Sequence, residues 1–271
     1  MPKVSVIIPT YNRVALLAQT VESAQMAGSD VEVIVVDDGS TDQTSEMCAA
    51  LPGIRYIRLN RNQGNAYARN AGILLSEAEF IAFLDDDDLR LPGTIDLQVR
   101  ALENAPEAAF VYGRVLIGDA DHRLPTGEIA PDNCPQGDVF WELLAGNFIQ
   151  MPSVIARRQS LVETGLFHSN IMGVEDWEMW LRLAEQFPVI AVDEAVAIYR
   201  KGSSLSGQLT SNRVKMFHRM LYVQEEALRG ARARAAPRAK RRKTRRGLRH
   251  LAYDVMILRK LMFKDSIALV V

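Results

Sequence analysis

The chain has few of the residues that usually build metal clusters or disulfide frameworks. Its 271 residues include only two cysteines, Cys48 and Cys134, and four histidines. Neither set has the spacing of a zinc site or of a disulfide framework, so we expect a reducing compartment. No apolar run reaches the ~18 residues that cross a bilayer, and Met1–Val4 does not open a signal peptide. These absences predict a cytoplasmic protein.

Glycine-rich phosphate loops are also missing. The sequence contains neither G-x-G-x-x-G nor G-x-x-x-x-G-K, the two patterns whose backbone amides hold phosphates. A nucleotide site in this chain must therefore rely on a metal ion and on arginine to hold phosphate.

Charge is distributed unevenly along the chain. Residues 229–271 hold 14 of the 32 Lys and Arg residues and only two acids, whereas residues 1–228 carry a net charge of −13. We therefore expect an acidic body, suited to metal chemistry, and a basic C-terminal extension, suited to an anionic surface. Hydrophobic content of 48% is typical of a globular protein.

The first ~115 residues alternate short apolar runs with helical patterns. This alternation predicts βαβ units, a mostly parallel central sheet flanked by helices, and an α/β fold. The expected strands are Val4–Pro9, Val31–Val36, Ile54–Leu59, Phe80–Leu84 and Ala109–Leu116. The expected helices are one capped by Asn12, one over Thr41–Ala50 capped by Ser40 or Thr41, Gly64–Ser76 and Leu91–Asn104.

Beyond Gly118 the alternation loosens. We expect a loop over residues 118–137, because that stretch is rich in Gly, Pro and Asp. Helices are expected at Asp138–Ala145, at Glu175–Phe187 and from Arg213 to near Leu228, and short strands at Met151–Arg157, Val189–Val192 and Ala195–Arg200.

Four consecutive carboxylates, Asp85–Asp88, follow the expected strand Phe80–Leu84. Adjacent carboxylates repel one another and need a compensating cation or wide exposure to water. An acidic cluster at the end of a buried strand favours a hard divalent metal ion that bridges to phosphates. The alternative is a solvated acidic loop.

Other polar residues also follow expected strands. In an open parallel sheet, ligands bind at the carboxyl ends of the strands, so we expect these residues to meet in one crevice. Thr10 and Tyr11 can face a planar base, Asp38 can accept a hydrogen bond from a base or ribose, and Arg69 can reach a phosphate. Alternatively, Asp37–Ser40 only forms a turn and a helix cap.

Five segments together resemble the family-two glycosyltransferases of the GT-A fold. They are Val4–Arg13, Val33–Asp42, Asn62–Gly72, Phe83–Asp88 and Glu175–Arg182. They occur in the order typical of that family and span residues 4–200.

The resemblance implies a GT-A, Rossmann-like domain at 1–228, with a nucleotide-sugar-binding half at 1–117 and an acceptor-binding half at 118–228, followed by a helical extension at 229–271. It also implies an inverting transfer from a nucleotide-diphosphate-sugar to an acceptor hydroxyl, assisted by Mn²⁺ or Mg²⁺. The family's pathways imply polysaccharide, cell-wall or glycolipid synthesis.

Residue roles follow from the same resemblance. Asp85 and Asp87 would form the metal-binding Asp-x-Asp motif, and Asp176 would be the general base. Acceptor binding is assigned to Glu175 and Trp177. The nucleotide-sugar would contact Pro9, Thr10, Tyr11, Asp38, Arg69, Asp85 and Asp86.

Two of these roles have structural alternatives. Asp176 could be a helix N-terminal acid favoured by the helix dipole. Trp177 and Trp180 are three residues apart on one helix, and such a pair packs in a core more often than it stacks on a sugar.

One departure from the family pattern concerns the metal. Relatives often carry a histidine shortly after a Tyr-Arg pair, but residues 199–204 read YRKGSS. We therefore expect a metal ion to depend on carboxylates and donor phosphates alone.

The basic extension has two interpretations of equal weight. Leucines and other apolar residues recur at helical spacing among arginines after residue 245, a pattern typical of a helix that lies on an anionic membrane surface. Such a helix would bring the enzyme to a lipid-linked acceptor at the inner face of the membrane. Alternatively, it packs on the body or on a partner chain. We do not expect nucleic-acid binding, because no base-reading module accompanies the charge.

Two rival functions are kept open. One is a catalytically silent nucleotide-sugar-binding protein on the same scaffold. The other is a nucleotidyltransferase, against which the absence of a glycine-rich basic loop after the first strand argues.

Overall fold

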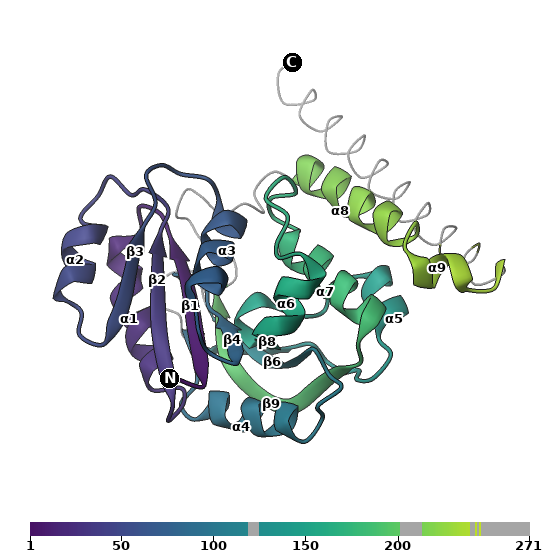
Figure 1. Cartoon of the computed structure of the whole chain (residues 1–271), viewed down its shortest axis with the longest axis horizontal. Coiled ribbons are helices and arrows are strands. Elements are labelled where there is room, and N and C mark those ends of the chain that lie inside the picture. Colours follow the sequence, from purple (N-terminus) through teal and green to yellow (C-terminus); the bar gives the residue numbers. More distant parts are fainter. Residues whose placement is uncertain (119–124, 201–212, 239–241, 243, 245–271) are drawn as a thin grey trace, which may run out of the picture.

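The computed structural model describes residues 1–118, 125–200, 213–238, 242 and 244 (Figure 1). The strands are β1 (Val4–Thr10), β2 (Val31–Asp37), β3 (Ile54–Arg58), β4 (Phe80–Phe83), β5 (Leu89–Arg90), β6 (Phe110–Gly118), β7 (Pro125–Ala130), β8 (Ile155–Arg157) and β9 (Val189–Arg200). The helices are α1 (Val14–Gln25), α2 (Thr44–Ala50), α3 (Asn65–Leu75), α4 (Thr94–Glu103), α5 (Phe140–Ala145), α6 (Arg158–Thr164), α7 (Glu175–Gln186), α8 (Arg213–Ala227) and α9 (Ala231–Ala235), with a 3₁₀ turn at Met151–Ser153.

One sheet runs through the molecule in the order β3-β2-β1-β4-β8-β6-β9-β5, with β7 paired to β6. The first four strands pair in parallel, as predicted. The second half is mixed, because β8 runs antiparallel to β4 and β6, and β5 runs antiparallel to β9. The parallel half therefore ends where β4 meets β8.

Helices cover both faces of this sheet. Alternate residues of β1 point to opposite faces, so Ile7 joins the core beneath α3 and α7, while Val6 and Ile8 join the core beneath α1 and α4. Because both faces are covered, all seven residues of β1 are buried. The apolar face of α1 is buried through Leu17, Val21 and Ala24.

Several predicted boundaries were wrong. Arg13, not Asn12, precedes α1 as its cap residue, and α2 starts at Thr44 rather than at Thr41. In both cases Asp42 takes the capping role: its carboxylate accepts hydrogen bonds from the backbone N–H groups of Val14 (3.3 Å) and Thr44 (3.1 Å).

The second half also differs from the expected elements. Helix α6 was not expected, and β7 lies in the stretch predicted to be a loop. Strand β9 is one continuous element, whereas two short strands were expected at its ends. Its register against β6 shifts near Arg114, and this irregularity explains why the apolar pattern is interrupted at Asp193 and Glu194.

The described start of the basic extension packs on the body. Ala233 of α9 is fully buried, and the Arg232 guanidinium donates to the carbonyl of Ala184 (2.7 Å) and lies over the Phe140 ring. Figure 1 shows α8 and α9 on the side of the molecule away from α1 and α2. Residues 245–271, where the amphipathic pattern was noted, lie outside the described residues, and the division at residue 228 stays a prediction. None of the helices in the described ranges is long and apolar enough to span a membrane.

Candidate functional site

The acidic loop, Asp85–Asp88, follows β4 and is closed by backbone hydrogen bonds. The N–H of Leu84 donates to Ile7 on β1 (3.2 Å), and the N–H of Asp88 donates to the carbonyl of Asp85 (3.0 Å). The Thr20 hydroxyl, on α1, lies 3.1 Å from the carbonyl of Asp86 and 3.0 Å from that of Asp88. Hydrogen bonds to β1 and α1 therefore fix the conformation of the loop.

A cavity of about 670 Å³ opens above this loop. Its wall includes the segment after β1, the loop before α3, the acidic loop, the start of α7 and the end of β9. The polar and aromatic residues that these segments contribute include Tyr11, Arg13, Arg69, Asp85, Asp86, Asp87, Glu175, Asp176 and Arg200. The carboxyl ends of β1 and β4 therefore converge on one crevice, as predicted, whereas Asp37–Ser40 at the end of β2 do not line it.

Arg69 joins the acidic loop to the start of α7. Its guanidinium donates to Asp85 Oδ1 (2.5 Å) and to Glu175 Oε1 (3.1 Å), and its side chain is 3% exposed. Burial alone would lower the pKa of Arg69, but the charges of Asp85 and Glu175 outweigh it and raise the pKa above the ordinary value. Arg69 is therefore a permanent cation at the junction of the two acidic segments.

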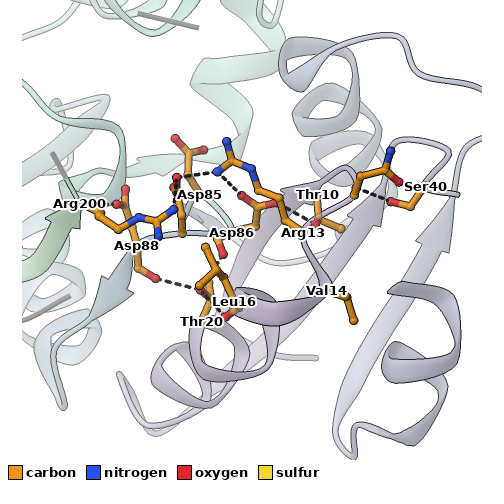
Figure 2. Close-up of polar contacts among 12 residues, drawn as sticks. Thr10, Arg13, Val14, Leu16, Thr20, Ser40, Asp85, Asp86, Asp88 and Arg200 are labelled. Carbon is orange, nitrogen blue, oxygen red and sulfur yellow. Dashed lines mark hydrogen bonds and ion pairs between the residues drawn. The ribbon is translucent and has the colours of Figure 1, made fainter. Parts of the chain in front are cut away.

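Asp86 forms the buried centre of the loop. Its carboxylate accepts hydrogen bonds from the Thr10 hydroxyl (2.7 Å) and from Arg13 Nη1 (3.3 Å). Burial raises the pKa of Asp86 to about 7, although the charge of Arg13 opposes the shift. Figure 2 shows Arg13 and Arg200 reaching the acidic loop from opposite sides.

Asp176 lies at the first turn of α7, on the cavity wall. Its Oδ1 accepts a hydrogen bond from the N–H of Trp177 (2.6 Å), and its Oδ2 accepts one from the amide of Asn147 (3.3 Å). Burial, with a further contribution from the charge of Glu175, raises the pKa of Asp176 to about 7. A carboxylate with this pKa can accept a proton near neutral pH.

The segment Asp37–Ser40 forms a tight turn, which was the structural alternative for this motif. Asp37 accepts a hydrogen bond from the N–H of Ser40 (2.7 Å), and Asp38 accepts hydrogen bonds from the N–H groups of Gln63 (2.8 Å) and Gly64 (2.7 Å). Asp38 thereby holds the loop before α3, part of which lines the cavity. Burial raises the pKa of Asp38.

Gly39 makes this turn possible, and replacing it with Ala should destabilise the protein by about 2 kcal/mol. Its φ is +80°, and a Cβ would lie 2.9 Å from the backbone of Arg61. Chemical denaturation would measure the loss. Gly93→Ala is the matched control, because Gly93 has φ +71° but no atom within 4 Å of the place a Cβ would take; equal losses for both variants would show that the contact with Arg61 is unimportant.

Most of the predicted site residues share the cavity wall. Those on it are Pro9, Tyr11, Arg69, Asp85, Asp86, Asp87, Glu175 and Asp176. Thr10 and Asp38 lie behind the wall, where they are 2% and 1% exposed. The structure shows them supporting the wall, and their contact with a base stays a prediction.

Trp177 requires a correction. Its side chain is 2% exposed, and its indole N–H donates to the carbonyl of Leu143 (2.7 Å). The prediction that Trp177 binds an acceptor is therefore wrong: Trp177 packs in the core, as its three-residue spacing from the equally buried Trp180 indicated.

Sequence reasoning missed several residues of the site. Asn147 contacts Asp176, while Arg13 and Arg200 both contact Asp87 Oδ2, at 2.5 and 3.1 Å. Arg13 belongs to a segment already noted at the end of the first strand, so its place in the sequence was a usable signal. Nothing near Asn147 in the sequence indicates a site.

Two observations indicate that the acidic loop could hold a divalent cation. Six carboxyl groups (Asp85–Asp88, Glu175 and Asp176) gather around three arginines (Arg13, Arg69 and Arg200), so carboxyl groups outnumber the arginines that pair with them. The arginine contacts use Oδ1 of Asp85 and Oδ2 of Asp87, which leaves the second oxygen of each for a cation.

The protein alone supplies an incomplete ligand set. Within the described residues, no group of three His, Cys, Asp or Glu side chains is placed to hold a metal ion. Two carboxylates plus substrate phosphates and water are how Mg²⁺ is usually held in enzymes that bind phosphates. The arrangement therefore fits a cation that arrives with a diphosphate.

Comparisons with known proteins agree with this geometry. An uncharacterized glycosyltransferase of Rickettsia felis is 32% identical over 202 residues, which is 73% of this chain and 33% of that protein. A GalNAc(5)-diNAcBac-PP-undecaprenol beta-1,3-glucosyltransferase of Campylobacter jejuni is 32% identical over 74% of this chain and 65% of the relative. The chain thus spans about a third of the Rickettsia relative.

Solved structures share the fold. The S. aureus TarS 1-349 complex with UDP-GlcNAc superposes with a TM-score of 0.67 at 19% identity, over 89% of this chain and 70% of that one. The mannosyltransferase PcManGT of Pyrobaculum calidifontis, in complex with GDP-Man and Mn²⁺, gives 0.62 at 19% identity, over 87% and 66%. These are glycosyltransferases of the GT-A fold. The sequence matches the family described as Glycosyl transferase family 2 over residues 5–164, so the chain belongs to glycosyl transferase family 2.

Proposed function

We propose that the protein transfers a sugar from a nucleotide-diphosphate-sugar to an acceptor hydroxyl, with inversion at the anomeric carbon. The observation that carries the proposal is that Asp176, a half-buried carboxyl with a pKa of about 7, and the acidic loop line one cavity. A general base and a site for a leaving diphosphate are the two parts that a single displacement needs.

The donor half of the proposal has independent support. The cavity of about 670 Å³ is of the size that small-molecule ligands occupy. Tyr11, 40% exposed on the cavity wall, offers an aromatic face to a base. The TarS fragment of the same fold binds UDP-GlcNAc, which supports a nucleotide-sugar in this cavity.

Asp176 would act as the base. Its Oδ2 would take the proton of the acceptor hydroxyl as that oxygen attacks the anomeric carbon on the face opposite the leaving diphosphate. The contact with Asn147 orients this oxygen. One displacement of this kind inverts the configuration at the anomeric carbon.

Asp85 and Asp87 would hold a divalent cation, Mn²⁺ or Mg²⁺. The cation supplies charge stabilisation for the departing diphosphate without a proton transfer. The Mn²⁺ in the mannosyltransferase structure of the same fold supports this assignment, and so does the excess of carboxylates around the loop.

The acceptor would be a saccharide or a lipid-linked saccharide, in polysaccharide, cell-wall or glycolipid synthesis. The name of the Campylobacter relative specifies an undecaprenol-linked acceptor. Arg229 and Arg234, exposed at the start of the basic extension, are compatible with an anionic surface. A peripheral position at the inner face of the membrane is part of this proposal.

Asp87→Asn should abolish the part of donor stabilisation that depends on the metal, while stabilisation by donor alone remains. The measurement is a thermal-shift screen of UDP- and GDP-sugars with and without Mn²⁺. Asp132→Asn, at an exposed aspartate outside the cavity, is the control. A full Mn²⁺-dependent shift in the Asp87 variant would remove Asp87 as a ligand.

Measuring the release of nucleoside diphosphate from the same nucleotide-sugars distinguishes the enzyme from the rival function, a catalytically silent binding protein. A catalytically silent binding protein would be stabilised by the donor and would never release nucleoside diphosphate. The placement of Asp176, Asp85 and Asp87 on one wall favours the enzyme.

A further inference from the structure

Arg13 contacts two carboxylates of the acidic loop, and one of them, Asp87, is a proposed ligand of the cation. Its Nη1 lies 2.5 Å from Asp87 Oδ2 and 3.3 Å from Asp86 Oδ1. Its side chain is 25% exposed and lines the cavity. Within the described residues its side-chain contacts are with these two carboxylates, so nothing else fixes the guanidinium.

Arg200, the second cation on Asp87, is held more firmly. Its side chain is 2% exposed, and its backbone N–H donates to Asp88 Oδ1 (2.8 Å). Pairing of β5 with β9 places it there, since Leu89 lies opposite Ile198. Of the two arginines on Asp87, Arg13 is therefore the one that can move without disturbing the sheet.

A diphosphate entering the cavity would offer Arg13 a stronger partner. Guanidinium groups bind phosphate oxygens with two parallel hydrogen bonds, whereas Arg13 now contacts Asp87 through one nitrogen. Transfer of Arg13 to the diphosphate would remove one of the two guanidinium groups that contact Asp87 Oδ2, leaving Arg200 there at 3.1 Å, and would take a positive charge away from the loop. A divalent cation that binds alone, at the second oxygens of Asp85 and Asp87, is repelled by the Arg13 guanidinium.

We infer that Arg13 is a diphosphate-binding residue whose charge opposes cation binding until the nucleotide arrives, and so couples the binding of the two. The inference rests on the proposed function, because it takes the nucleoside diphosphate as the ligand of this cavity. Coupling of this kind is reciprocal: the nucleotide raises the affinity for the cation by the same factor as the cation raises the affinity for the nucleotide.

Mn²⁺ binding, followed by electron paramagnetic resonance with and without UDP, tests the inference. In the wild type, UDP should tighten Mn²⁺ binding by about tenfold or more. In Arg13→Gln, Mn²⁺ alone should bind about fivefold tighter, because a repelling charge is gone, and the tightening by UDP should fall to about threefold or less. Isothermal titration with UDP alone should show weaker binding to the variant.

Two further variants test whether the effect is specific to the guanidinium of Arg13. Arg13→Lys keeps the charge but not the two-nitrogen geometry, so its coupling should be intermediate. Arg100→Gln removes an exposed arginine outside the cavity and should behave as the wild type. Unchanged Mn²⁺ affinity and unchanged coupling in Arg13→Gln would overturn the inference, as would the absence of coupling in the wild type. If neither UDP nor GDP binds any variant, with or without Mn²⁺, the proposed function itself fails.

Discussion

Asp176→Asn should lower kcat by about 10²- to 10⁴-fold, the range by which general bases contribute. The substitution keeps the size of the side chain and one oxygen that can accept from the N–H of Trp177. Its NH2 group can neither accept the hydrogen bond from Asn147 nor take the acceptor's proton. The measurement is release of nucleoside diphosphate from whichever nucleotide-sugar stabilises the protein most. Binding of UDP should stay within about twofold of the wild type, because loss of an interaction made only in the transition state leaves ground-state binding intact.

The pH profile of the wild type gives a second test of the same role. A base must be unprotonated to act, and burial raises the pKa of Asp176 to about 7. The rate should therefore be level above pH 7 and fall about tenfold for each pH unit below it. Asp132→Asn should keep both the rate and the profile. A variant at Asp176 that retains full transfer would exclude it as the base.

The parallel half of the fold could be predicted because its signals are local. Strands β1 and β4 are buried throughout and β2 over most of its length, so these three read as largely apolar runs. Strand β3 is partly exposed and carries two arginines, but all four predicted strands lie within one residue of the observed ends. The boundaries of the helices were harder. Asn12 has φ +53° and its side chain accepts a hydrogen bond from Thr41, a contact across 29 residues that no local pattern reveals.

The mixed half could not be predicted from periodicity. Strand β9 is long, but the register shift near Arg114 exposes Asp193 and Glu194 in its middle. The pattern therefore indicated two short strands. Only the pairing with β6 shows that they are one element.

The carboxylates of the site and Arg69 were predictable, whereas Arg200 and Asn147 were not. A run of four aspartates after a strand is conspicuous because adjacent carboxylates repel one another and need cations or water nearby in any fold. Arg200 meets Asp87 only because β5 folds back on β9. Asn147 reaches Asp176 from the loop after α5, 29 residues away. Such contacts form only in the tertiary structure, and no local sequence pattern marks Arg200 or Asn147 as a site residue.

Arg69→Met should destabilise the protein by about 3–5 kcal/mol, the cost of leaving buried charges without their partner. Arg69 is 3% exposed, and Glu175 is nearly as buried, at 6%. Methionine fills much of the same space but leaves the carboxylates of Asp85 and Glu175 facing each other without a cation. For a domain of this size the melting temperature should fall by roughly 10 °C or more, which thermal unfolding followed by circular dichroism would detect.

The double variant Arg69→Met/Glu175→Gln distinguishes lost charge pairing from lost packing. If the unpaired Glu175 carboxylate is the main cost, its neutralisation should recover about half of the stability that the single variant loses. Lys3→Met, which breaks an exposed ion pair with Glu103, should cost far less, because water and salt screen an exposed pair. A small loss in Arg69→Met, comparable with that of Lys3→Met, would mean that Arg69 does not join the acidic loop to α7. In that case only the contact with Asn147 and the backbone of α7 would position Asp176.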